Sequence, residues 1–161
     1  AAFSDTSHAL VRARSGRAHY NACRDALYTL EARPVSPDYE EIFTFLRLRL
    51  RRRALLIFLT NLDDPVISET FDKHIGLLAN RHLVLVNMIA PPYMRPLFTG
   101  EAAACTDDVY RALGGHLEWR DLRTLEKNLR RRGVTLRTTT GEALLPDIVS
   151  QYLNVKQRQL L

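Results

Sequence analysis

The sequence predicts one α/β domain over residues 1–161, with a doubly wound, mainly parallel sheet and an N-terminal edge hairpin. Two observations predict this fold. Apolar runs at 54–60 and 82–89 lack alternation, which is typical of strands buried on both faces of a parallel sheet. Segments with apolar residues at helical spacing precede, separate and follow these runs, as in a sheet covered on both faces. No linker or repeat divides the chain, so we expect a single domain.

The first third of the chain predicts a hairpin and a helix. Residues 2–14 predict two short strands around a turn at Asp5 to Ser7. From about 18 to 31, apolar residues recur on one face of a helix, which we expect to be buried. The members of that face are Cys23, Ala26, Leu27 and Leu30.

The next helix follows a break at 33–37. Ser36 and Pro37 predict its N-cap and first turn, because a serine side chain accepts from free backbone N–H groups and proline suits the first helical position. Arginines crowd its outer face and its carboxyl end, where the helix dipole favours cations. These arginines are Arg47, Arg49, Arg51, Arg52 and Arg53.

The strand at 54–60 ends in a polar cluster, and Asp64-Pro65 predicts the N-cap and first turn of the following helix. Open α/β sheets bind ligands beyond the carboxyl ends of their strands, so a metal or polar ligand is expected there. The alternative is that Ser36 and Asp64 serve only as helix caps. The polar residues at this point are Thr60, Asn61, Asp63 and Asp64.

The last third predicts a long helix, a strand and a final helix. Residues 101–132 form the long helix, interrupted at Gly114-Gly115 and ended by Gly133. The strand covers 134–138, and the final helix follows Thr140-Gly141. We expect buried faces at Leu122, Leu125 and Leu129 in the long helix, and at Leu145, Ile148, Val149, Tyr152 and Leu153 in the final helix.

Charge leaves two interpretations open. The formal net charge is +5, and only three of the 23 basic residues are lysine. Arginine clusters at 47–53 and at Arg130, Arg131 and Arg132 could bind nucleic acid, acidic lipid or an acidic protein. Alternatively, the 18 acidic residues pair with them and the surface is only solvated. Nucleic acid is the less favoured partner.

Motifs that carry chemistry are scarce. The chain has no Gly-x-Ser-x-Gly elbow, phosphate-binding glycine loop, His-Glu-x-x-His or Cys-x-x-Cys, and its histidines share no ligand spacing. Cys23 and Cys105 are isolated, which favours a reducing compartment. We therefore predict that the protein is not an enzyme. A metal-assisted hydrolase using Asn61, Asp63 and Asp64 is a remote alternative.

Several segments, in chain order, resemble a bacterial family of von Willebrand factor A-like domains called domain of unknown function fifty-eight. Members of that family often accompany MoxR-type AAA+ ATPases. The resemblance runs from residue 2 to the end of the chain. Its segments are Ala-Phe-Ser-Asp at 2–5, Asp-Tyr-Glu at 38–40, the run at 53–62, the run at 81–86, the run at 129–134, and Tyr-Leu-Asn-Val-Lys at 152–156.

This resemblance implies a Rossmann-like sheet and, in metal-binding relatives, a metal-ion-dependent adhesion site. Such a site takes an Asp-x-Ser-x-Ser loop after the first strand, a threonine from a second loop, and an aspartate after the central strand. Here the first strand would lie before residue 1, Ser36 stands near the threonine position, and Asn61 replaces the aspartate. We expect Ser36, Asn61 and Asp63 to form only a remnant rim without metal. Magnesium would require the missing first strand.

The missing strand would lie between the 2–5 strand and the 54–60 strand, so its absence would leave unpaired backbone. We expect the hairpin to pair elsewhere, or two chains to form a homodimer by pairing or exchanging strands. The predicted function is a non-enzymatic protein-interaction module that partners a MoxR-type AAA+ ATPase. The alternative is arginine-mediated binding of nucleic acid or an acidic surface. The expected location is the cytoplasmic side, with membrane attachment only through segments upstream of Ala1.

Overall fold

The computed structural model describes residues 1–5, 7–11, 14–31, 34–99 and 105–159. At its centre is a three-stranded parallel sheet with the strand order β3-β4-β5. Leu55 lies opposite Leu83, and Leu85 lies opposite Thr135. The predicted α/β class with a parallel sheet is therefore confirmed. The strands are β3 (Leu55–Leu59), β4 (Leu83–Ile89) and β5 (Thr135–Thr139).

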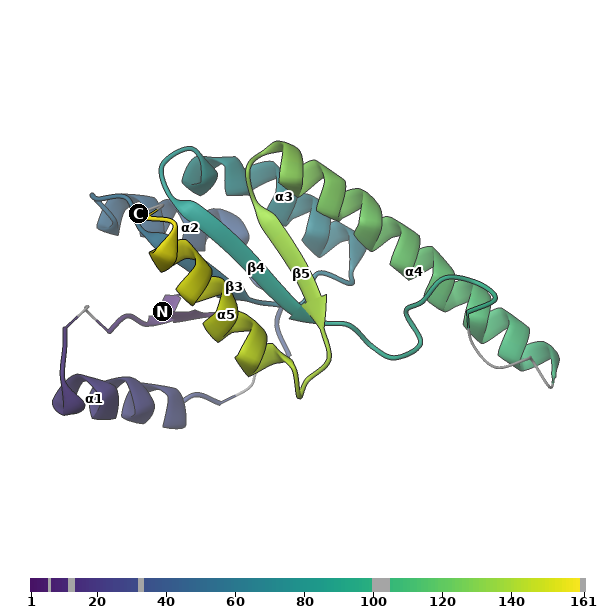
Figure 1. Ribbon diagram of the computed structural model, residues 1–161, viewed down its shortest axis with the longest axis horizontal. Helices are drawn as coiled ribbons and strands as arrows, with labels where there is room; N and C mark the ends of the chain where they lie inside the picture. Colours follow the sequence, from purple (N-terminus) through teal and green to yellow (C-terminus); the bar gives the residue numbers. More distant parts are fainter. Residues whose placement is uncertain (6, 12–13, 32–33, 100–104, 160–161) are drawn as a thin grey trace.

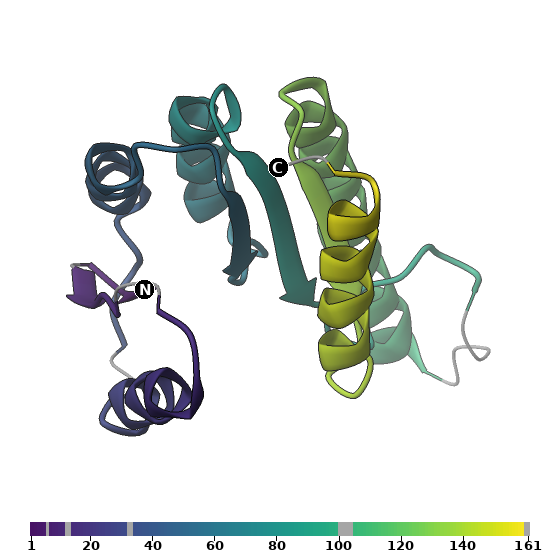
Figure 2. The ribbon, with the colours of Figure 1, turned by 60° about the vertical axis from the view of Figure 1, so that its left-hand side comes forward.

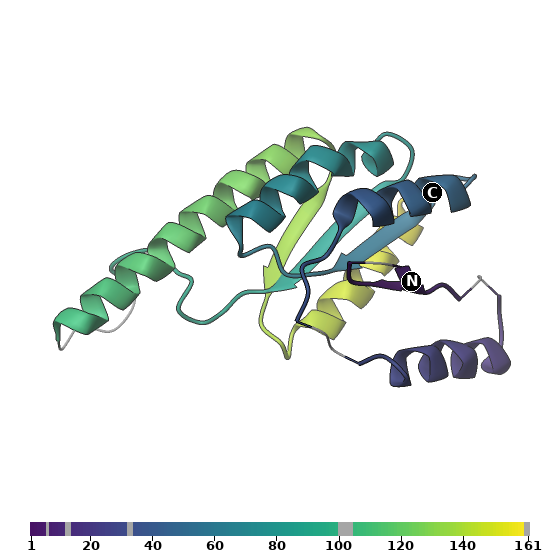
Figure 3. The ribbon, with the colours of Figure 1, turned by 180° about the vertical axis from the view of Figure 1, so that it is seen from behind.

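Helices cover both faces of this sheet. Helices α2, α3 and α4 lie on one face, and α5 lies on the other (Figures 1 and 3). Helix α1 stands apart from the sheet (Figure 1). Among the described residues, no helix combines the length and the apolar character that a membrane crossing requires. The helices are α1 (Arg17–Tyr28), α2 (Tyr39–Arg49), α3 (Pro65–Ala79), α4 (Thr106–Arg131) and α5 (Leu144–Gln157).

An aromatic cluster joins α2 and α3 to β3. The rings of Tyr39 and Phe71 meet edge to face at 4.9 Å between centroids, and Phe43 lies 5.4 Å from Phe58. All four side chains are buried. Phe3 extends the cluster from the N-terminal hairpin, 6.1 Å from Tyr39. Edge-to-face aromatic pairs add about 0.5–1.5 kcal/mol each beyond burial, so this cluster fixes α2 against the sheet.

A buried polar pair, rather than the predicted apolar face, holds α5 to the sheet. Asn87 of β4 and Gln151 of α5 exchange two hydrogen bonds of 2.6 and 3.4 Å, and both are almost completely buried. The predicted buried face of this helix was wrong, because the amides turn Gln151 and Val155 towards the sheet. Its members Leu145, Val149, Tyr152 and Leu153 are exposed, and Ile148 is half-buried.

The helix ends confirm two predictions and correct one. Asp64 caps α3 by accepting from Val66 N at 2.7 Å, with Pro65 in the first turn. Gly133 ends α4 with a φ of 79°, which glycine adopts without strain. Ser36 and Pro37 are not the cap and first turn of α2. Asp38 is the N-cap, because its carboxylate accepts from the backbone N–H of residue 41 at 2.9 Å.

The predicted interruption of α4 at Gly114-Gly115 was also wrong, since the helix is continuous from Thr106 to Arg131. Gly115 is buried under the loop that follows β4, and a Cβ placed there would collide with the carbonyl oxygen of Tyr93. The glycine therefore permits close packing rather than a break. The predicted buried face at Leu122, Leu125 and Leu129 is confirmed.

The N-terminal hairpin forms, with β1 (Ala2–Phe3) antiparallel to β2 (Ser7–Ala9) in a separate two-stranded sheet. Among the described strands it pairs with no strand of the central sheet, so the predicted place of the hairpin at an edge of that sheet was wrong. A hydrogen bond from Asp38 N to Ser4 O (3.0 Å) attaches it to the start of α2. The predicted burial of one α1 face was wrong, because no side chain of α1 is buried. Leu27 is 65% exposed and Cys23 is half-exposed, so α1 keeps an uncovered apolar face.

Candidate functional site

The side chains of the polar cluster beyond β3 form hydrogen bonds with one another, with the local backbone and with neighbouring side chains. Asn61 donates to the Asp63 carboxylate at 2.8 Å, and that carboxylate also accepts from Asp64 N at 3.0 Å. Thr60 shares a 2.7 Å hydrogen bond with the Tyr39 hydroxyl. Burial raises the pKa of the Tyr39 phenol, and the hydrogen bond with Thr60 opposes that shift. These contacts make the cluster a structural corner between β3, α2 and α3.

The predicted remnant rim is only partly assembled. Asn61 and Asp63 line the same hollow, whereas Ser36 is an exposed residue of the preceding loop and does not line it. Across the part of the chain that the structure describes, no three His, Cys, Asp or Glu side chains gather closely enough to hold a metal ion. The arrangement gives a hard cation few charged oxygens.

The open edge of β3 is a different kind of site. Leu83 N donates to Ala54 O at 2.9 Å, and Thr60 N donates to Asn87 O at 3.2 Å. Because backbone groups alternate between the two edges of a strand, the even-numbered residues from 54 to 60 face β4. Among the described strands, β4 is the only neighbour of β3. The residues whose N–H and C=O groups face the open side are Leu55, Ile57 and Leu59.

A groove follows this edge. Its volume is about 280 Å³, and it is lined by every residue of β3, by Ile42 and Leu46 of α2, and by Ala1 and Phe3. A second hollow of about 630 Å³ continues from Leu59 past the polar cluster and shares Ala1 and Phe3 with the first. The groove therefore has β3 as one wall and β1 as the other, with α2 beside them.

Charges of opposite sign lie at the two ends of this groove. The arginines 51–53 precede β3, and Asp63 and Asp64 follow it, and all five side chains are exposed. The wall between them is apolar, and Leu59 is 58% exposed. Edge strands in soluble proteins are usually protected by charges, proline or a bulge, and β3 has none of these within its five residues.

The apolar run identified β3, and the family resemblance, not the run itself, predicted unpaired backbone beside it. An apolar run without alternation predicts burial on both faces, and four of the five residues are at least half-buried. Strand pairing is not local, so the run gives no information on whether a strand lies at an edge. The prediction of an unpaired edge came from the resemblance, in which the missing first strand lies between the 2–5 strand and the 54–60 strand.

The arginine clusters predicted from the sequence are exposed at the other end of the strands.

Comparisons with protein-family models, curated proteins and solved structures found no match to this chain.

Proposed function

We propose that this chain is a non-enzymatic protein-interaction module of the von Willebrand factor A-like type, which binds an extended segment of a protein partner along the edge of β3. The observation that supports this proposal is the row of outward backbone groups at Leu55, Ile57 and Leu59 beside an apolar groove. Adding a strand to an open sheet edge is a recurring mode of peptide recognition, in which main-chain hydrogen bonds supply affinity.

The walls of the groove restrict the occupant. β1 and Phe3 form the second wall of the groove, so a strand that enters it lies between β3 and β1. Both backbone edges of that strand must therefore be unpaired before it binds. A flexible segment meets this condition, whereas β3 of a second copy is already paired with its own β4. A homodimer through this edge would require the hairpin to move, so we favour a separate protein partner.

The flanking charges define the chemistry of the segment. A segment of about five apolar residues would match β3, with acidic residues beside the arginines 51–53 and basic residues beside Asp63 and Asp64. The resemblance to domain of unknown function fifty-eight adds a candidate partner, a MoxR-type AAA+ ATPase. Scarce catalytic motifs agree with binding rather than catalysis.

Two proline variants test the proposal with matched backbone changes. Leu59→Pro removes an N–H that faces the open edge of β3, and Thr138→Pro removes an N–H that faces the outer edge of β5. Thr139 O accepts from Ala90 N at 3.2 Å, so the backbone groups of residue 139 face β4 and the backbone N–H of Thr138 faces away from it. Both residues are exposed, and proline at such positions costs no ladder hydrogen bond.

The assay is calorimetric titration with the purified MoxR-type ATPase from the same genome. We expect Leu59→Pro to weaken binding about tenfold or more, because a backbone bond is lost and the ring obstructs the incoming strand. Thr138→Pro should bind like the parent chain. Hydrogen exchange should show that the partner protects the amides of Leu55, Ile57 and Leu59. Equal loss in both variants, or no protection at these amides, would refute the edge as the binding site.

Light scattering distinguishes the remaining alternative. A monomer is expected for the isolated chain. A dimer that Leu59→Pro converts to a monomer would assign the edge to a second copy and overturn the proposal of a separate partner.

A further inference from the structure

A single edge of the sheet carries basic side chains from four separate parts of the chain. The amino ends of the three strands lie together with the carboxyl ends of α2, α3, α4 and α5, at the top of Figure 2. We call this region the basic edge. It comprises the arginines within 47–53, Arg81, the arginines 130–132, Lys156 and Arg158.

Contacts bring these segments together. Leu83 N donates to Ala54 O, so residue 81 lies beside the loop that contains the arginines 51–53. Arg132 of the α4–β5 connection reaches Asp72 of α3 at 2.9 Å. Arg158 lines a hollow with Leu83, which places the end of α5 at the start of β4. The two arginine clusters of the sequence, almost 80 residues apart, therefore belong to one surface.

The basic edge is not neutralised from within. Among the described side chains of the basic edge, Arg132 alone forms an ion pair, and its partner is Asp72. Its basic residues are exposed. The segments that build it contain no aspartate or glutamate. These segments are 46–54, 80–83, 129–135 and 152–159.

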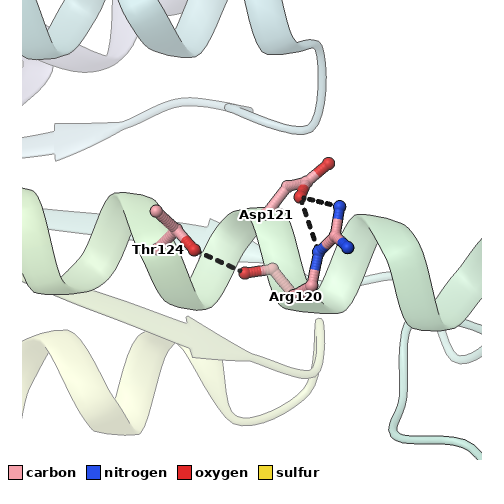
Figure 4. A network of polar contacts seen from close by, with 3 residues as sticks. All are labelled: Arg120, Asp121 and Thr124. Carbon is pink, nitrogen blue, oxygen red and sulfur yellow. Dashed lines mark hydrogen bonds and ion pairs between the residues drawn. The ribbon is translucent and has the colours of Figure 1, made fainter.

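Outside the basic edge, four of the described arginines form ion pairs: Arg24, Arg111, Arg120 and Arg123. Along α4, the Arg120 guanidinium donates twice to Asp121, at 3.1 and 3.2 Å (Figure 4). Arg123 pairs with Glu126 at 2.6 Å one turn later. Helix dipoles favour cations only within the last turn, which accounts for Arg47 and Arg49 of α2 but not for the arginines 51–53 beyond it. The surplus of unpaired arginine at the basic edge indicates an external anion.

We propose that the basic edge binds the anionic phospholipid surface of a bilayer. Guanidinium groups match phosphate and carboxylate oxygens with two parallel hydrogen bonds, and the headgroup of phosphatidylserine carries both groups. The side chains extend from the carboxyl ends of helices and from the loops that follow them. Leu48 is 75% exposed between Arg47 and Arg49, where an apolar side chain enters the interface. The backbone groups along the open edge of β3 lie on the side of the sheet and stay free for its partner, whereas the arginines 51–53 belong to both surfaces.

Sedimentation with lipid vesicles tests the proposal. The chain is mixed with vesicles of phosphatidylcholine alone and with vesicles containing phosphatidylserine, at about physiological ionic strength. We expect binding only to the anionic vesicles. Each basic residue near such a surface raises the partition roughly fivefold, so replacing three should weaken it about a hundredfold.

Two sets of variants remove three charges each. The first changes the arginines 51–53 of the basic edge to glutamine. The control changes Arg24, Arg95 and Arg111 to glutamine, because these residues are exposed and lie on α1, the loop after β4 and the distant start of α4. A second edge variant changes Arg130 and Arg131 to glutamine, so that a folding defect confined to residues 51–53 cannot account for a loss of binding. Circular dichroism checks that all three variants are folded.

The edge variants should lose most vesicle binding, and the control should lose little. Equal loss in the control would show nonspecific attraction by net charge and would refute a defined surface. Absence of binding to anionic vesicles would also refute it. Tighter binding to duplex DNA or single-stranded RNA, lost in the same edge variants, would assign the basic edge to nucleic acid and overturn the membrane proposal.

Discussion

Replacing Gly115 by alanine tests how the loop after β4 packs on α4. Gly115 is buried, and an added Cβ would lie 3.0 Å from the carbonyl carbon of Tyr93 and closer still to its oxygen. A backbone carbonyl cannot rotate away as a flexible side chain can, so the loop itself must shift. Met94, which is buried in the core directly after Tyr93, would move with it.

Gly114 provides the matched control. It precedes Gly115 on the same helix, is exposed, and has no atom within 4 Å of an added Cβ. Gly114→Ala should stabilise the chain by about 1 kcal/mol, because alanine forms helix more readily than glycine. Gly115→Ala gains the same propensity but adds an overpacking cost of about 1–3 kcal/mol, and the fixed backbone contact places it at the upper end.

The two variants should therefore differ in the free energy of unfolding by about 2–3 kcal/mol, with opposite directions relative to the parent chain. For a chain of this size, that difference corresponds to roughly 4–12 °C in Tm. Urea titration and calorimetric melting measure it. If Gly115→Ala proves as stable as Gly114→Ala, the loop does not pack against α4 at Tyr93, and the continuous buried helix needs another explanation.

Two further variants test buried polar groups. Gln151→Met should lower the free energy of unfolding by about 1–3 kcal/mol in urea titration, because Asn87 would be left without its buried partner. Adding Asn87→Leu to this variant should lower the free energy of unfolding by less than Asn87→Leu does alone. Additive losses in the double variant would contradict the pairing. The ring of His82 accepts from Ala54 N at 3.2 Å, and burial, with Arg81 nearby, lowers its pKa from the ordinary 6.5. The folded chain thus favours neutral His82, so its stability should be complete above pH 6.5 and fall as the pH drops below it. His82→Asn keeps an acceptor that does not titrate and should flatten this part of the pH profile, whereas an unchanged profile would exclude His82 as the cause.

Local patterns predicted several parts of the fold correctly. The apolar runs of β3 and β4, the cap at Asp64 with Pro65, and the end of α4 at Gly133 each depend on residues close in sequence. The cap of α2 was misplaced by two residues because Ser36 and Asp38 are both good caps, and the contact of Asp38 N with Ser4 O decided between them.

The faces of α1 and α5 could not be predicted in the same way. Spacing defines an apolar stripe on a helix, but it does not show whether another element covers that stripe. In α5 the Asn87–Gln151 pair turned the polar side inwards, because a buried amide without a partner costs more than an exposed leucine.

The sequence by itself determined the parallel α/β core, because apolar runs, caps and glycine ends are local and each favours one conformation. It also supplied the arginines 51–53 and 130–132 and the acidic pair at Asp63 and Asp64. Only the tertiary structure decided that the N-terminal hairpin leaves the edge of β3 unpaired and that the two arginine clusters share one surface. Both features depend on which strands and helix ends become neighbours, and that is fixed by packing between residues far apart in the chain.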